Sequence, residues 1–145
     1  MINLRKLAAL AVLAIPALGS AQILDIEVTG VAQPTPVAVV PFGWEGQAAD
    51  MPLDIVKVIR EDLKRSGRFA PIEEAKMLQK PTDGADVDFQ DWSFVGVEAV
   101  VVGKVIQTGA NAYTLQFQLF DVFGRRQLLG YRMPASRGTM RGAAH

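Results

Sequence analysis

The 145-residue sequence contains no cysteine, and its only histidine, His145, is the last residue. Without cysteine the chain can form no disulfide, thiolate zinc site, cysteine nucleophile or lipid-modified cysteine. A Ser-His-Asp relay and the usual histidine metal sites need histidines inside the fold, so they are excluded as well. We therefore expect no enzyme, no metal site and no cofactor.

The charge balance excludes a further class of partner. Lysine and arginine together number 15, as do aspartate and glutamate, so the formal net charge is zero. A chain without a basic excess has no broad positive field with which to hold nucleic acid. The segment Gly43–Gly46 lacks the spacing of a phosphate-binding loop. The sequence thus predicts binding of neither nucleic acid nor nucleotide.

The longest apolar stretch lies at the N-terminus. Arg5 and Lys6 precede the apolar run Leu7–Leu18, and the small residues Gly19 to Ala21 follow it. The run is too short to cross a bilayer, and this order is typical of a cleaved secretory signal. A retained membrane anchor is the alternative. We expect residues 1–21 to be a signal peptide and the mature chain to begin at Gln22, with no direct membrane insertion after cleavage.

Residues 22–33 form a separate N-terminal arm in front of the predicted core. Apolar and polar residues alternate from Leu24 onward, which is the period of a strand with one apolar and one polar face. Pro34 and Pro36 are expected to form a stiff spacer behind the arm. The arm is either an ordinary edge strand or a mobile strand that adds to the sheet of another protein. Its candidate partner-binding residues are Gln22, Ile23, Leu24, Asp25, Ile26, Glu27, Val28, Thr29, Gly30 and Val31.

Two apolar runs, Val37–Val40 and Ala99–Val102, are predicted to be neighbouring central strands, because continuous apolar runs are typical of strands buried on both faces. A loop is expected at Gly43–Gly46. Arg68–Ile72 is expected to be a short strand. Alternation in Tyr113–Leu119 and the segment Gln127–Met133 predict antiparallel strands that close a meander. Together with the helices described next, these strands predict an α/β two-layer sandwich, with a mixed sheet of four to five strands and two main helices.

The first helix is expected from about Pro52 to Ser66, with Asp50 as a candidate cap, and a shorter one over Phe89–Val95 between Asp88 and Gly96. The outer face of the first helix carries five cations, which form either an anion site or a solvated face. These are Lys57, Arg60, Lys64, Arg65 and Arg68.

Ser136–His145 has the pattern of a helix start, with Ser136 as the cap. Either the native chain ends in this segment, or the sequence is a fragment cut near the start of a longer helix.

Several of these motifs, in this order, resemble the family of TolB N-terminal domains. They are Pro36–Phe42 with the loop to Trp44, Asp54–Val56 with Asp62–Phe69, Trp92 with Gly96–Gly103, Tyr113–Asp121, and Met140–His145. The resemblance covers almost all of the mature chain. It implies a periplasmic protein–protein interaction module of the Tol-Pal envelope system, which supports outer-membrane integrity and cell division.

The resemblance also implies partners. In that family an N-terminal arm, the TolB box, binds the C-terminal domain of the inner-membrane protein TolA, and a downstream β-propeller binds the lipoprotein Pal. Gln22–Gln33 occupies the place of the arm, and residues 34–145 that of the α/β domain, which we expect to be truncated in its last helix. The propeller is missing from this sequence, so no residue here is assigned to Pal.

A related fold group is the alternative. It contains periplasmic domains of outer-membrane lipoproteins that activate peptidoglycan synthases or assemble export pores. Those proteins carry a lipidated cysteine after the signal, whereas Ala21 and Gln22 stand at that place here.

Overall fold

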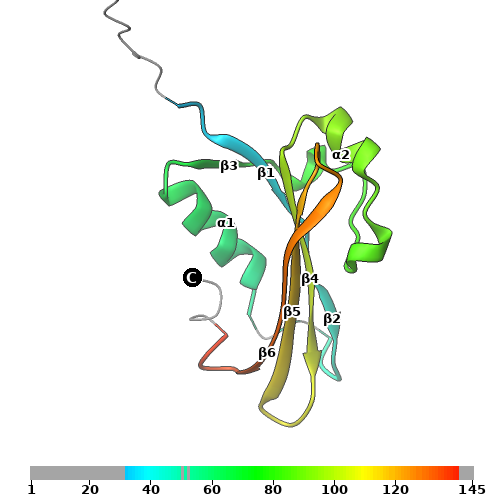
Figure 1. The fold of residues 1–145 in the computed structure, drawn as a ribbon. Helices are drawn as coiled ribbons and strands as arrows, with labels where there is room; N and C mark the ends of the chain where they lie inside the picture. Colours follow the sequence, from blue (N-terminus) through cyan, green and yellow to red (C-terminus); the bar gives the residue numbers. More distant parts are fainter. Residues whose placement is uncertain (1–31, 50, 52, 141–145) are drawn as a thin grey trace, which may run out of the picture.

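The structure is a computed structural model that describes residues 32–49, 51 and 53–140. Its centre is a mixed sheet of six strands in the order β3-β1-β4-β5-β6, with β2 paired to β4 (Figure 1). The elements in chain order are β1 (Thr35–Val39), β2 (Gly43–Glu45), α1 (Ile55–Arg65), β3 (Phe69–Pro71), two short 3-10 turns (Glu74–Lys76 and Gly84–Asp86), α2 (Phe89–Val95), β4 (Ala99–Gln107), β5 (Ala112–Asp121) and β6 (Arg126–Ser136).

β1 and β4 are the neighbouring central strands that the two apolar runs predict. They run parallel, with Val37 opposite Ala99 and Val39 opposite Val101. On its other side β1 pairs with β3, also in parallel, whereas β4, β5 and β6 form the expected antiparallel meander. The predicted α/β fold with a mixed sheet and two helices is confirmed, and the sheet has six strands where four to five were expected.

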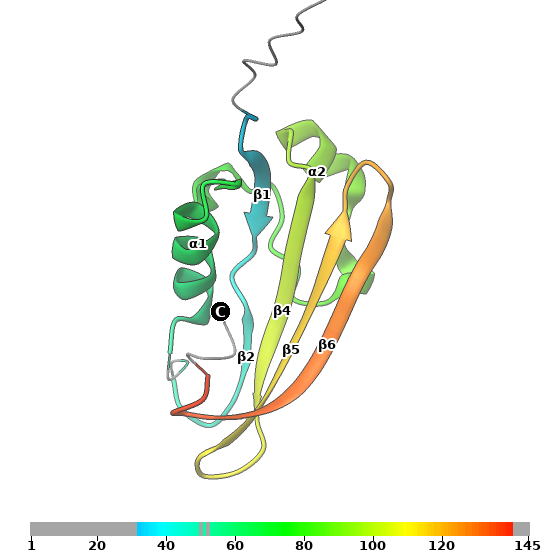
Figure 2. The ribbon, with the colours of Figure 1, turned by 60° about the vertical axis from the view of Figure 1, so that its left-hand side comes forward.

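The additional strand is β2, and the loop expected at Gly43–Gly46 was wrong for its first three residues. β2 pairs in parallel with β4 from Lys104 to Ile106, beyond the end of β1 (Figure 2). Val39 lies opposite Val101, and Gly43 lies opposite Lys104. Four residue steps on this side thus match three steps on β4, so the chain has one extra residue between β1 and β2. Because β4 extends beyond β1, its backbone N–H and C=O groups there need hydrogen-bond partners, and pairing with β2 supplies them.

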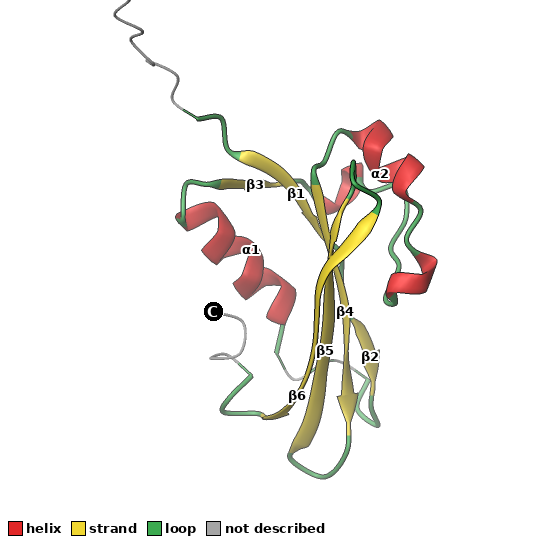
Figure 3. Cartoon of the chain, in the orientation of Figure 1, coloured by secondary structure: helices red, strands yellow, loops and turns green. Residues whose placement is uncertain are grey.

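Each face of the sheet carries one helix (Figures 1 and 3). Each face also has one cluster of buried apolar side chains. α1 buries Ile55 in the cluster that contains Val105, whereas α2 buries Trp92 in the cluster that contains Val100. Because successive side chains of a strand point to opposite faces, β4 supplies both clusters. The sheet therefore lies between the two helices.

Local signals fix both ends of α2 where the sequence predicts them. A carboxylate oxygen of Asp88 accepts a hydrogen bond from the Gln90 N–H at 2.8 Å, as an N-cap does. Gly96 ends the helix with a φ of 83°, a left-handed conformation that glycine adopts at little cost.

The first helix starts later than expected. α1 begins at Ile55, and its N-cap is Asp54, whose Oδ1 accepts a hydrogen bond from the Lys57 N–H at 3.0 Å. Asp50, the expected cap, lies outside the described residues. Asp54, four residues further along the chain, caps the helix with a side-chain carboxylate, the group that was expected from Asp50.

Replacing Asp54 by alanine is expected to lower the free energy of unfolding by about 1 kcal/mol, because the Lys57 N–H loses its partner. Urea unfolding followed by circular dichroism measures this loss. The matched control is Glu61→Ala on the exposed side of the same helix, which should change stability by less than about 0.5 kcal/mol. Equal losses in the two variants would show that the cap contributes nothing.

Candidate interaction site

The predicted partner-binding residues, Gln22 to Val31, lie outside the residues that the structure describes. The structure does show where the arm joins the domain, at one end of β1 (Figure 1). There the Thr35 N–H donates a hydrogen bond to the Arg68 carbonyl at 2.9 Å, and the Glu98 N–H donates to the Pro36 carbonyl at 2.8 Å. The arm therefore joins a central strand that is bonded on both sides from its first residues.

The two prolines behind the arm have different places. Pro34 precedes β1, but Pro36 is the second residue of the strand and lies opposite Ala70 of β3. Proline has no N–H to donate, and a position near the start of a strand tolerates it. The spacer predicted from Pro34 to Pro36 is therefore shorter than expected, because Pro36 belongs to the sheet.

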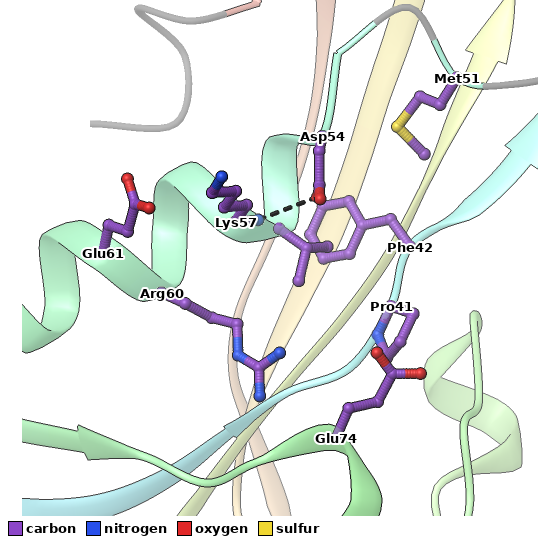
Figure 4. Close-up of a pocket in the computed structure, with 9 residues that line it drawn as sticks. Pro41, Phe42, Met51, Asp54, Lys57, Arg60, Glu61 and Glu74 are labelled. Carbon is purple, nitrogen blue, oxygen red and sulfur yellow. Dashed lines mark hydrogen bonds between the residues drawn. The ribbon is translucent and has the colours of Figure 1, made fainter.

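A pocket of about 410 Å³ lies beside the first half of α1 and the break between β1 and β2 (Figure 4). Residues from four separate segments of the chain line it. They are Pro41, Phe42, Met51, Asp54, Val56, Lys57, Arg60, Glu61 and Glu74. Sequence reasoning missed this pocket, because no local pattern marks residues that come together from four segments.

The charged groups of this pocket are largely engaged within the domain. Arg60 donates a hydrogen bond to the Ile72 carbonyl, and Lys80 donates one to Glu74 at 2.6 Å. The hydrogen bond from Lys80, and its positive charge, hold the pKa of Glu74 below its ordinary value. The lining contains three carboxylates and two cations, so it offers no excess of positive charge to an anion.

The five cations of the first helix do not converge on one point. Arg60 is half-buried and turns to the Ile72 carbonyl, while Arg65 pairs with Asp62 at 2.8 Å. Lys57, Lys64 and Arg68 are exposed. The arrangement of these five cations therefore supports a solvated helix face and not an anion site.

Within the described part of the chain, no group of three or more histidine, cysteine, aspartate or glutamate side chains is placed to hold a metal ion. None of the described helices has the length and apolar character needed to cross a membrane. That the domain is no enzyme stays a prediction from the sequence.

These features define a small α/β domain with a mixed sheet between two helices. The same fold occurs in the LpoB C-terminal domain from Salmonella enterica, with a TM-score of 0.56 over 74% of this chain and 87% of that chain. The two are 16% identical, so the likeness is one of fold alone. The lipoprotein GNA1162 from Neisseria meningitidis has the same fold, with a TM-score of 0.55 and 18% identity over 71% of this chain and 81% of that chain.

Sequence comparison gives the particular family. Residues 24–128 match the family described as the TolB amino-terminal domain. The Tol-Pal system protein TolB of Thioalkalivibrio sulfidiphilus is 48% identical over 129 residues, which are 88% of this chain and 30% of that protein. The TolB of Xanthomonas oryzae pv. oryzae is 39% identical over 145 residues, 98% of this chain and 33% of that protein. The chain belongs to the family of TolB amino-terminal domains.

The crystal structure of TolB from Acinetobacter baumannii shows the same arrangement. It matches with a TM-score of 0.58 and 25% identity, over 79% of this chain and 26% of that chain. The present chain thus spans about a third of the length of the curated relatives it matches.

Proposed function

We propose that this chain is a protein–protein interaction module of the Tol-Pal envelope system, and that residues Gln22–Val31 of its arm bind the C-terminal domain of TolA in the periplasm. In this role it supports outer-membrane integrity and cell division. The observation that carries the proposal is the family match, which begins at residue 24 and so includes most of the arm. The curated relatives are named Tol-Pal system proteins, which supports the same role.

The proposal gives the domain no catalytic step, in keeping with a sequence whose one histidine is its last residue. The secretory pattern of residues 1–21 supports export to the periplasm. Pal would take part through the β-propeller that the family resemblance implies, and none of these 145 residues is assigned to it.

The alternation of the arm explains how it would be recognised. One row consists of Leu24, Ile26 and Val28, and the other of Asp25, Glu27 and Thr29. A strand of this kind can hydrogen-bond to an exposed sheet edge while alternate side chains enter pockets of the partner. Ordering a free arm costs about 1–2 kcal/mol per residue in backbone entropy, so we expect moderate and reversible binding.

The way in which β1 is held supports an arm that is separable from the domain. β1 pairs with β3 and β4 through residues that begin at Thr35, and the apolar clusters of the two faces contain no described residue before Ala38. Removing the arm therefore takes away no described strand and no member of these clusters.

Deleting residues 22–33 is expected to abolish binding of the TolA C-terminal domain, measured by isothermal titration calorimetry, and to leave the melting midpoint of the domain nearly unchanged. Within the arm, Ile26→Ser should weaken binding about tenfold or more, because a large apolar side chain contributes about 1.5–3 kcal/mol on burial. Gln33→Ser, at the end of the arm and beyond the proposed binding residues, is the matched control and should bind normally. Unfolding of the domain on deletion, or binding that survives it, would contradict the proposal.

A further inference from the structure

The two edges of the sheet differ in length and in what packs against them. One edge is β3, which has three residues, ends at Pro71 and packs against α1. The other edge is β6, which has 11 residues, most of them exposed. In the part of the chain that the structure describes, no strand pairs with the outer side of β6. Because an open edge strand is a template for pairing with another chain, β6 is a candidate surface for a partner.

Hydrogen-bonding groups of the β6 backbone point outward from Gly130 to Pro134, where the pairing of β6 with β5 is regular. The Ser136 N–H shows the direction, since it donates to the Thr139 hydroxyl at 2.7 Å and not to β5. Successive residues of a strand turn their backbone groups to opposite sides, so Pro134, Arg132 and Gly130 turn outward as Ser136 does. Proline suits such a position, because it has no N–H to donate. The outer side of β6 therefore offers the N–H and C=O groups of Gly130 and Arg132 and the carbonyl of Pro134.

Positive charge collects on β6 and at its two ends, although the chain as a whole has a net charge of zero. Residues 122–140 include four exposed arginines and no lysine, aspartate or glutamate. Arg126 forms an ion pair with Asp121 at 3.4 Å. No described acidic side chain forms an ion pair with the other three, which are Arg125, Arg132 and Arg137. An acidic partner segment therefore meets uncompensated positive charge along this edge.

The side chains beside this edge differ between the two faces of the sheet. On the face that carries α2, a hollow of about 320 Å³ opens at Gly130, which has no side chain of its own. Its polar lining consists of Gln116, Gln118, Gln127 and Arg132. On the face that carries α1, Tyr131 is 55% exposed and its ring lies 5.6 Å from that of Phe117. Because amide and guanidinium groups donate hydrogen bonds, the first face suits carboxylates, whereas the second suits apolar side chains.

We propose that the outer side of β6 binds an extended segment of another protein, in which acidic and apolar residues alternate, as a further antiparallel strand of the sheet. Antiparallel pairing continues the meander of β4, β5 and β6 and is slightly more stable per residue than parallel pairing. Backbone hydrogen bonds to Gly130 and Arg132 provide affinity, while alternate side chains provide specificity. The acidic row faces Arg132 and the hollow, and the apolar row lies beside Tyr131. This second interaction site does not rest on the proposed binding of TolA.

A second copy of this chain fits the edge less well than an acidic partner does. Two β6 strands paired edge to edge would bring arginines of one copy close to those of the other, and like charges across a strand pair are destabilising. Charged residues on edge strands commonly prevent pairing of this kind. On β6 they do so selectively, because the same charges that repel a second copy attract an acidic strand.

The test uses two synthetic peptides of about six residues, a usual strand length, in which valine alternates with glutamate or with lysine. Each is titrated into the isotope-labelled 145-residue chain, and NMR follows the backbone amide signals. The valine–glutamate peptide is expected to bind and to shift the signals of Gly130 and Arg132, whereas the valine–lysine peptide should do neither. Arg132→Glu should weaken binding about fivefold or more, because it turns an attraction between charges into a repulsion. Lys57→Glu, at an exposed position of α1, changes the net charge equally and is the matched control.

Strand pairing also predicts which backbone groups of the peptide are needed. In an antiparallel pair, the glutamate opposite Arg132 exchanges both backbone hydrogen bonds with it. Methylating the glutamate nitrogens should therefore abolish binding, and methylating the valine nitrogens should not.

Any other outcome of the two methylations would overturn the proposal, as would unchanged binding in Arg132→Glu or no binding of the valine–glutamate peptide. Arg132→Gln, which removes the charge without reversing it, serves as the second variant if Arg132→Glu does not fold. Binding that appears only after deletion of residues 22–33 would overturn the proposal and identify the arm as the occupant. Binding that appears only on dilution of the protein would overturn it and identify a second copy.

Discussion

Replacing Trp92 by alanine is expected to lower the free energy of unfolding by about 3–5 kcal/mol, as large truncations of buried aromatic side chains do. Trp92 is fully buried and is the largest fully buried side chain of the described residues. Its indole N–H has no hydrogen-bond partner there, so its stabilising contribution comes from packing. Trp92 is the buried residue of the seven-residue helix α2, and Phe89 and Val95 are partly buried against the same cluster.

Urea unfolding followed by circular dichroism measures the loss, and α2 itself provides the control. Phe94 lies two residues further along the helix and is 85% exposed. Phe94→Ala should change the free energy of unfolding by less than about 0.5 kcal/mol, as surface substitutions usually do. A Trp92→Ala loss as small as that of Phe94→Ala would show that α2 does not depend on the buried ring.

The second large effect is expected at Gly103, in the middle of β4. A Cβ atom at this position would lie 2.6 Å from the Gln116 carbonyl oxygen of β5 and 2.9 Å from the ring of Phe42. Both neighbours are held, one by the strand ladder and the other in a buried cluster, so neither can withdraw cheaply. Gly103→Ala should therefore cost about 1–3 kcal/mol, the usual range for overpacking.

Gly109, in the loop between β4 and β5, provides the comparison for Gly103. A Cβ atom there would meet only the Ala112 Cβ at 3.4 Å, which is close to ordinary contact. Gly109→Ala should leave the melting midpoint almost unchanged, and differential scanning calorimetry of the two variants measures the contrast. If Gly103→Ala has the same melting midpoint as the parent protein, the close approach of β5 and Phe42 to Gly103 is not a packing constraint.

The parts of the fold that depend on neighbouring residues were predictable from the sequence. Asp88 and Gly96 enclose α2 at the expected bounds, because capping and a left-handed end are properties of a few adjacent residues. The apolar runs at Val37–Val40 and Ala99–Val102 predicted the paired strands β1 and β4, because a continuous apolar run is also a property of adjacent residues. A glycine inside a strand often marks a close approach of backbone or side chains, and Gly103 is such a position.

The features that were missed depend on residues far apart in the sequence. Gly43–Glu45 carries turn residues and became a strand only because β4 extends past β1. The pocket beside α1 has lining residues from four segments. The alternation in Tyr113–Leu119 predicted the strand β5, but the part of the sheet that α1 covers depends on contacts with β1 and β3, which are distant in the sequence from β5. The arm at Gln22–Val31 stays a prediction from the sequence, because these residues lie outside those that the structure describes.

The position of β1 has a mechanical consequence for any partner that pulls on the arm. The arm leaves the sheet next to Thr35, whereas β6 ends at Ser136, opposite Ala112 at the other end of the meander. A force between these two points acts along the strands, across hydrogen bonds that lie at a steep angle to it. β1 can then slide out only if its bonds to β3 and β4 rupture together in shear, instead of one after another as in unzipping. A pull on the N-terminal end of β1 therefore loads its bonds to β3 and β4 together.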